Sequence, residues 1–100
     1  MRVVTFCDFD EKYLGNYEHC YFMSGCNGKA DVAILDINSI FDYEEKKLEI
    51  VNENYMSIAI IDDPSDYDAF KNFGITAWIK RENLEELPNL LKEIESRLKS

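Results

Sequence analysis

The chain has 100 residues, of which 46% are hydrophobic and 13% aromatic, and its formal net charge is −9 at pH 7. This is enough apolar material for the core of one α/β domain spanning residues 1–100, and it excludes a disordered chain. The acidic balance argues against nucleic acid or an anionic membrane surface as a partner, because basic faces bind both.

The sequence shows neither a signal peptide nor a long apolar stretch, so we expect a soluble, cytoplasmic protein. Its three cysteines are odd in number and not densely spaced, and we expect no disulfide framework. Cys7 lies in an apolar run and is predicted to be a small buried residue. His19, Cys20 and Cys26 are only weak zinc candidates, because no fourth ligand stands at a suitable spacing.

The first elements differ in how clearly they can be predicted. Residues 1–7, "MRVVTFC", are rich in β-branched and aromatic residues and predict a buried strand, which Asp8 and Asp10 follow. Residues 11–29 contain three glycines, and a short strand around residues 20–23 is the best prediction there. The aromatic residues of this segment either cover a bare sheet edge or form a partner patch. They are Tyr13, Tyr17, Tyr21 and Phe22.

Residues 30–40, "ADVAILDINSI", begin with an aliphatic run that predicts a strand over residues 32–35, and this run ends on Asp36. A helix is predicted from Asp42, with Glu45 three residues later as in a capping box. A set of residues at helical spacing predicts its buried face. These are Phe41, Leu48, Val51 and Tyr55.

The second half of the chain continues the alternation. Residues 57–61, "SIAII", predict a buried strand that ends on Asp62 and Asp63. A short helix is predicted after Pro64 and is expected to end at Gly74. Residues 75–79, "ITAWI", predict another strand, with Trp78 in the core and Lys80 following.

The last helix is predicted to have Asn83 as its cap, but Pro88 indicates that the regular helix begins nearer Leu87. Its apolar stripe comprises Leu84, Leu87, Leu90, Leu91, Ile94 and Leu98. Short strands that alternate with helices predict a parallel sheet with right-handed crossovers.

Charged residues follow each of the four clearest predicted strands, and parallel strands would collect them at one edge of the sheet. These residues are Asp8, Asp10, Asp36, Asp62, Asp63 and Lys80. Carboxylates this close repel one another, and a divalent cation such as Mg²⁺ relieves the repulsion. A lysine supplies a point charge for a phosphoryl group. The pattern suggests metal-assisted phosphoryl chemistry on an aspartate; alternatively, each Asp merely terminates a strand.

Two stretches resemble response-regulator receiver domains. Residues 30–38, "ADVAILDIN", resemble the strand that carries the phosphoacceptor, and residues 69–87, "AFKNFGITAWIKRENLEEL", resemble the end of such domains. The resemblance implies a flavodoxin-like, Rossmann-like three-layer sandwich with a mostly parallel sheet of four or five strands. It implies that Asp36 accepts the phosphoryl group and that Lys80 contacts the phosphate. Asp8 and Asp10, with Asp36, would hold Mg²⁺.

The same resemblance implies a role in two-component signal transduction or a phosphorelay. The partner would be a histidine kinase or a downstream signalling protein, and a homodimer is a further possibility. Two departures matter. Asp62 replaces the Thr or Ser of the switch position, and the short interval between Asp8 and Asp36 predicts that the early helices are shortened or missing. A working switch phosphorylated on Asp36 and a degenerate pseudo-receiver used for docking therefore both remain open.

The residues "VVTFCDFDEK" also resemble the first motif of haloacid-dehalogenase-type phosphohydrolases. That resemblance implies a Mg²⁺-dependent phosphatase with Asp8 as nucleophile and Asp10 as general acid/base. Against it, Glu11 and Lys12 replace the Gly-Thr that normally follows this motif. A third possibility is an unrelated α/β binding domain, so the sequence leaves open whether the chain is an enzyme.

Overall fold

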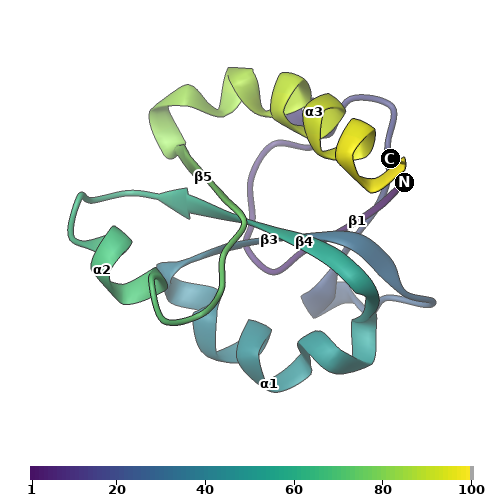
Figure 1. Ribbon diagram of the computed structural model, residues 1–100, viewed down its shortest axis with the longest axis horizontal. Coiled ribbons are helices and arrows are strands. Elements are labelled where there is room, and N and C mark those ends of the chain that lie inside the picture. The colour runs from purple at the N-terminus through teal and green to yellow at the C-terminus, as the bar shows by residue number, and fades with distance from the viewer. Residues whose placement is uncertain (100) are drawn as a thin grey trace.

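The computed structural model describes residues 1–99. This part of the chain contains five strands, three α-helices and four short 3₁₀ turns (Figure 1). The strands are β1 (Arg2–Thr5), β2 (Glu18–Tyr21), β3 (Ala30–Asp36), β4 (Val51–Ile61) and β5 (Ala77–Lys80). The α-helices are α1 (Ile40–Ile50), α2 (Asp66–Phe70) and α3 (Leu87–Lys99). The 3₁₀ turns are η1 (Glu11–Leu14), η2 (Phe22–Ser24), η3 (Ile37–Ser39) and η4 (Arg81–Glu86).

The strands form one sheet in the order β2-β1-β3-β4-β5, and every neighbouring pair is parallel. This is the strand order of flavodoxin-like folds. In Figure 1, α3 covers one face of the sheet, and α1 and α2 cover the other. The predicted three-layer α/β fold with a parallel sheet is therefore confirmed.

Each face of the sheet has its own hydrophobic core, and β3 contributes to both. Val32 and Ile34 pack with residues of α3, whereas Ala33 and Leu35 pack with Ile40 and Tyr43 of α1. Alternate residues of a strand point to opposite faces, so a strand covered on both sides needs the unbroken aliphatic run that the sequence contains.

The early crossovers are reduced as predicted. The connection from β1 to β2 contains only η1, and the connection from β2 to β3 contains only η2. Helix α2 has five residues, which confirms a short element after β4. Helix α3 begins at Leu87, also as predicted, because Pro88 then lies in the first turn, where its missing N–H breaks no helical hydrogen bond. The stripe from Leu84 to Ile94 is buried at Leu84, Leu87, Leu91 and Ile94.

Helix α1 differs from its prediction at the N-terminus. It begins at Ile40, and the preceding capping box is formed by Asp36 and Ser39 around η3. The proposed box of Asp42 and Glu45 was wrong, since Asp42 lies inside the first turn. An Asp that ends a buried strand can cap the next turn directly, and this leaves no room for an intervening loop.

The buried face predicted for α1 was also wrong. Helix α1 ends at Ile50, because residues 51–61 are all in β4, whose Val51 and residues 56–60 pair with β3. Val51 and Tyr55 therefore belong to a strand. Phe41 and Leu48 are 79% and 80% exposed, and the helix is anchored instead by Ile40 and Tyr43.

Two further predictions need correction. Cys20 and Cys26 form a disulfide, with their Cα atoms 5.7 Å apart, although no disulfide framework was expected from the sequence. Trp78 is 44% exposed and packs edge-to-face on Tyr67, because it alternates with the buried Ile79 and lies over the short α2. Cys7 is buried as predicted. In the part of the chain that the structure describes, no helix is long and apolar enough to cross a membrane.

Candidate functional site

The carboxyl ends of β3 and β4 bring Asp36 and Asp62 to the same face of the sheet. In β3, Asp36 lies two residues after Ile34 and four after Val32. In the same way, Asp62 lies two residues after Ile60 and four after Ile58 of β4. All four of these aliphatic side chains pack under α3. The period of two along each strand therefore directs both carboxylates toward the α3 side of the sheet edge.

Arg81 lies between these two carboxylates. Its Nη2 donates a hydrogen bond to Oδ2 of Asp36 at 2.9 Å and another to Oδ2 of Asp62 at 3.1 Å. Its Nε donates to Oδ1 of Asp62, so the contact with Asp62 is bidentate. We call these three residues the Arg81 clasp. It connects the ends of β3 and β4 with the start of η4.

Asp36 has hydrogen-bond donors on both of its carboxylate oxygens. Oδ1 accepts from the backbone N–H groups of Asn38 and Ser39 at 3.1 Å and from the hydroxyl of Ser39 at 3.0 Å. Oδ2 accepts from Arg81. Only 9% of the Asp36 side chain is exposed to solvent. The carboxylate is thus held in one orientation by the turn that it caps and by the guanidinium.

The electrostatics of the clasp follow from this geometry. The hydrogen bonds from Arg81 hold the pKa of Asp62 below its ordinary value, and the same contacts raise the pKa of Arg81. The neighbouring thiol of Cys7 has a pKa raised to about 12, mainly by burial and further by the negative charge of Asp36. Cys7 therefore stays protonated at neutral pH and is a poor nucleophile.

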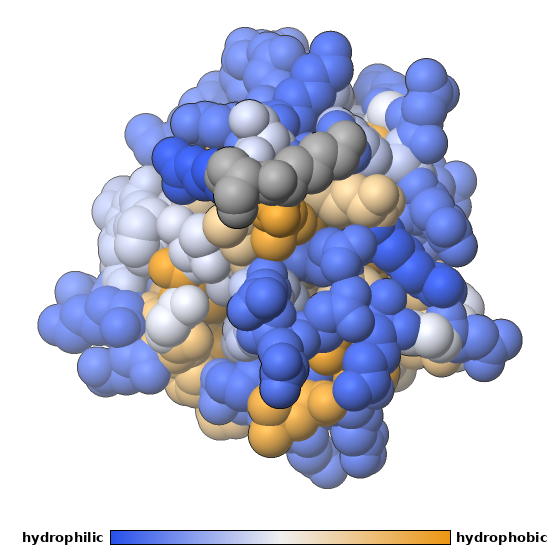
Figure 2. Space-filling model, turned by 45° about the vertical axis from the view of Figure 1, so that its right-hand side comes forward, coloured by the Kyte–Doolittle hydropathy of each residue, from blue (hydrophilic) through white to orange (hydrophobic). Residues whose placement is uncertain are grey.

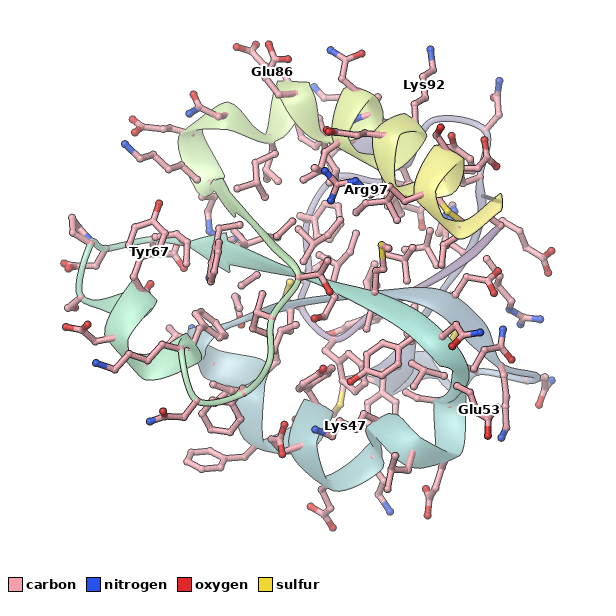
Figure 3. All side chains as sticks on the ribbon, viewed as in Figure 1. Lys47, Glu53, Tyr67, Glu86, Lys92 and Arg97 are labelled. Carbon is pink, nitrogen blue, oxygen red and sulfur yellow. A yellow bond between two sulfur atoms is a disulfide. The ribbon has the colours of Figure 1, made fainter. Side chains whose placement is uncertain are left out.

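Lys80 lies at the same edge but on the other face of the sheet. It alternates with the buried Ile79, so it is directed toward the α2 side of the sheet. Among residues 1–99, it forms no ion pair or hydrogen bond with another side chain. It lines an open groove of about 440 Å³ together with Tyr67, which Figure 3 shows projecting from α2. The remaining lining residues are Ile61, Asp62, Asp63, Pro64, Arg81 and Glu82.

The acidic residues around α2 support the loop that precedes it. Oδ2 of Asp66 accepts from the backbone N–H groups of Asp62 and Asp63 at 3.0 and 3.2 Å. Oδ1 of Asp63 accepts from the backbone and the hydroxyl of Ser65, and these bonds lower the pKa of Asp63. These contacts shape the turn that presents Asp62 to Arg81.

The two acidic residues after β1 have separate surroundings. Oδ1 of Asp10 caps η1 by accepting from the backbone N–H of Lys12 at 3.0 Å. Asp8 lines a small cavity of about 90 Å³ with Cys7 and His19. Neither residue is part of the clasp.

The expected Mg²⁺ site would lie among the acidic residues at this edge. Within the described range 1–99, no group of three or more His, Cys, Asp or Glu side chains could hold a metal ion. The guanidinium of Arg81 neutralises Asp36 and Asp62 where a cation would otherwise be needed, and it leaves no oxygen of Asp36 without a donor. In this arrangement the clasp does not fit Mg²⁺, which prefers carboxylate oxygens and water.

Arg81 was not among the residues predicted from the sequence, although one signal pointed to it. Ile79 is apolar, so Arg81 two positions later shares its face of the sheet and Lys80 does not. The resemblance to receivers drew attention to Lys80 instead. Comparisons with models of protein families, with curated protein sequences and with solved structures found no match to this chain.

Proposed function

We propose that this chain is a receiver-like signalling domain that acts through protein–protein contacts without phosphoryl transfer, in other words a pseudo-receiver. The flavodoxin-like strand order supports the comparison with receivers. The single observation that carries the proposal is the contact of Arg81 with both Asp36 and Asp62.

The clasp opposes phosphorylation of Asp36 for two reasons. A carboxylate attacks phosphorus through an oxygen lone pair, and Oδ2 of Asp36, the oxygen outside the capping box, is nearly buried and hydrogen-bonded to a guanidinium that lowers its nucleophilicity. Asp62, at the position of the switch residue, carries a negative charge at neutral pH and would repel a phosphoryl group. A phosphoryl group on Asp36 would also have to compete with Asp62 for the guanidinium.

The clasp also favours one constant surface at this edge of the sheet. Arginine stays protonated at every physiological pH, so neither pH nor a bound ion is needed to keep the ends of β3 and β4 attached to η4. A domain held in this way presents the same groove and helices to a partner at all times. The partner would be a kinase or another signalling protein, and the net charge of −9 favours one with a basic surface.

Incubation with acetyl phosphate and Mg²⁺ tests this proposal. We expect the intact mass of the protein to stay unchanged and no phosphate to be released above the buffer background. An added phosphoryl mass that disappears in Asp36→Asn would contradict the proposal and show a working receiver. Phosphate release that disappears in Asp8→Asn would instead support the phosphohydrolase, a reading that no contact of Asp8 or Asp10 favours.

Arg81→Ala/Asp62→Thr is the matched variant for the same assay. It removes both obstacles, the guanidinium on Oδ2 of Asp36 and the repelling carboxylate of Asp62, so a slow adduct that depends on Asp36 is expected in this variant. An adduct of equal yield in the parent and in Arg81→Ala/Asp62→Thr would remove the clasp as the cause.

A further inference from the structure

Helix α1 exposes two large apolar side chains that its own fold does not use. Phe41 is 79% and Leu48 is 80% exposed, whereas Ile40 and Tyr43 anchor the helix to the sheet. At 100° per residue, positions seven apart lie within about 20° of each other around a helix. Phe41 and Leu48 therefore share one outward-facing stripe, two turns apart.

Acidic side chains surround this pair. Glu44 and Glu45 are each three or four residues from both Phe41 and Leu48, so they lie between them on either side of the stripe. Asp42 and Glu49 extend the acidic border, and both are exposed. In Figure 2, hydrophobic surface at the lower end of the molecule, the end where α1 lies in Figure 1, is bordered by hydrophilic side chains. We call the set Phe41, Asp42, Glu44, Glu45, Leu48 and Glu49 the α1 face.

The two lysines of α1 do not neutralise this border completely. Lys47 pairs with Glu44 at 2.7 Å and lies over the ring of the buried Tyr43, on the side of α1 next to the sheet (Figure 3). Lys46 pairs with Glu49 at 3.8 Å. In the described chain, Asp42 and Glu45 form no ion pair. The α1 face therefore combines two apolar anchor points with unpaired negative charge.

We propose that the α1 face docks a basic amphipathic helix of a partner protein. The two anchor points are about 10 Å apart along the helix axis, which is the spacing of apolar residues seven apart on a partner helix. Lysine or arginine side chains beside those residues would meet Glu45, Asp42 and Glu49. Charge complementarity also argues against a second copy of this chain, because two acidic faces on molecules of net charge −9 repel each other.

This inference rests on the proposed function, because it names the class of partner that a non-phosphorylated domain would contact. The probe is a synthetic 15-residue helical peptide with leucines at helical spacing and lysines beside them. A matched peptide carries glutamate at every lysine position. Both are titrated into the full ¹⁵N-labelled chain and followed by NMR and by calorimetry.

We expect the basic peptide to shift the amide signals of α1 and the acidic peptide to leave them unchanged. The double variant F41S/L48S should weaken binding at least tenfold, and Glu45→Gln should weaken it by a smaller, salt-dependent factor. Both serines replace exposed side chains, and circular dichroism verifies that the variant is folded. Met23→Ser is the control, because Met23 is 65% exposed on η2 outside the α1 face and its loss should leave the affinity unchanged.

The docking proposal is overturned if F41S/L48S binds as tightly as the parent, if the shifts fall on another surface, or if neither peptide binds. It is likewise overturned if sedimentation equilibrium shows a dimer of the parent that F41S/L48S abolishes, since the occupant would then be a second copy. A phosphoryl adduct on Asp36 would contradict the proposed function and leave the peptide titration unaffected. The two failures are therefore distinguishable.

Discussion

Arg81 and Asp36 are 45 residues apart in the sequence, yet Nη2 of Arg81 and Oδ2 of Asp36 are 2.9 Å apart in the fold. The contact connects the end of a central strand with the first residue of η4, the turn that leads into α3. Because Asp62 shares the same guanidinium, one cation organises three segments at the carboxyl edge of the sheet.

Arg81→Met should lower the free energy of unfolding by about 1–3 kcal/mol, because it leaves the nearly buried Oδ2 of Asp36 without its charged donor. The partial exposure of Arg81 places the expected value toward the lower end of this range. Urea denaturation measures the change. Arg81→Lys should recover only part of the loss, since an ammonium group cannot reproduce the bidentate contact. In Arg81→Met/Asp36→Asn the two losses should be less than additive, and full additivity would show that the residues are not coupled.

The contribution of Asp62 to the free energy of unfolding should depend on pH. Its pKa is lowered in the folded state by the hydrogen bonds from Arg81, so the contribution is fully present above the ordinary value of 3.8 and is lost as pH falls through the lowered pKa. The difference in unfolding free energy between the parent and Asp62→Asn should therefore be constant from pH 7 to about pH 5 and should shrink in more acidic solution. Urea titrations across that range check it. If the difference in unfolding free energy grew on acidification, Asp62 would not have a lowered pKa in the folded state.

Reduction of the Cys20–Cys26 disulfide should destabilise the protein. The bond encloses a short loop, with a sequence separation of 6, and loop closure of this size contributes about 2 kcal/mol. The loop carries Phe22, whose ring stacks on Phe6 of the core with centroids 4.9 Å apart. We expect dithiothreitol to lower the urea midpoint of the parent and to leave that of Cys20→Ser/Cys26→Ser unchanged. If dithiothreitol lowered the urea midpoint of both proteins equally, reduction of this disulfide would not be the cause.

Tyr43 should make the fold sensitive to alkali. Its side chain is fully buried between α1 and the sheet, and burial, followed by the 2.6 Å hydrogen bond with the hydroxyl of Tyr55, raises its pKa above the ordinary 10.0. The unfolded chain therefore loses this proton first, so stability is complete below pH 10 and falls as pH rises further. Tyr43→Phe should cost about 1 kcal/mol at neutral pH, for the lost hydrogen bond. Tyr43→Phe should also lose less stability than the parent as pH rises above 10, which urea titrations at alkaline pH would show.

The sequence alone was sufficient for the sheet and for most of the helices. Aliphatic runs such as residues 30–35 can be buried on both faces only in a covered parallel sheet, and their alternation with amphipathic segments dictates the layers. The interval between Asp8 and Asp36 was too short for full crossovers, and η1 and η2 are the result. These features are local or depend on chain length, so they could be predicted without coordinates.

The start and the buried face of α1 could not be predicted in the same way. Phe41 and Leu48 fit a helical period as well as buried residues would, and only the folded structure, in which Ile40 and Tyr43 face the sheet, shows that they are left in solvent. The disulfide was missed for a similar reason. Whether Cys20 and Cys26 meet depends on the turn between β2 and β3, which no local pattern specified.

At the site, the sequence determined that carboxylates follow the strands, and the parallel sheet placed them at one edge. Which cation meets them was decided only by the tertiary structure. Lys80 and Arg81 are adjacent in the chain, but neighbouring residues at the end of a strand point to opposite faces of the sheet. Ile79 packs under α3, so Arg81, two positions later, lies on the same face and reaches Asp36 and Asp62, whereas Lys80 lies on the opposite face.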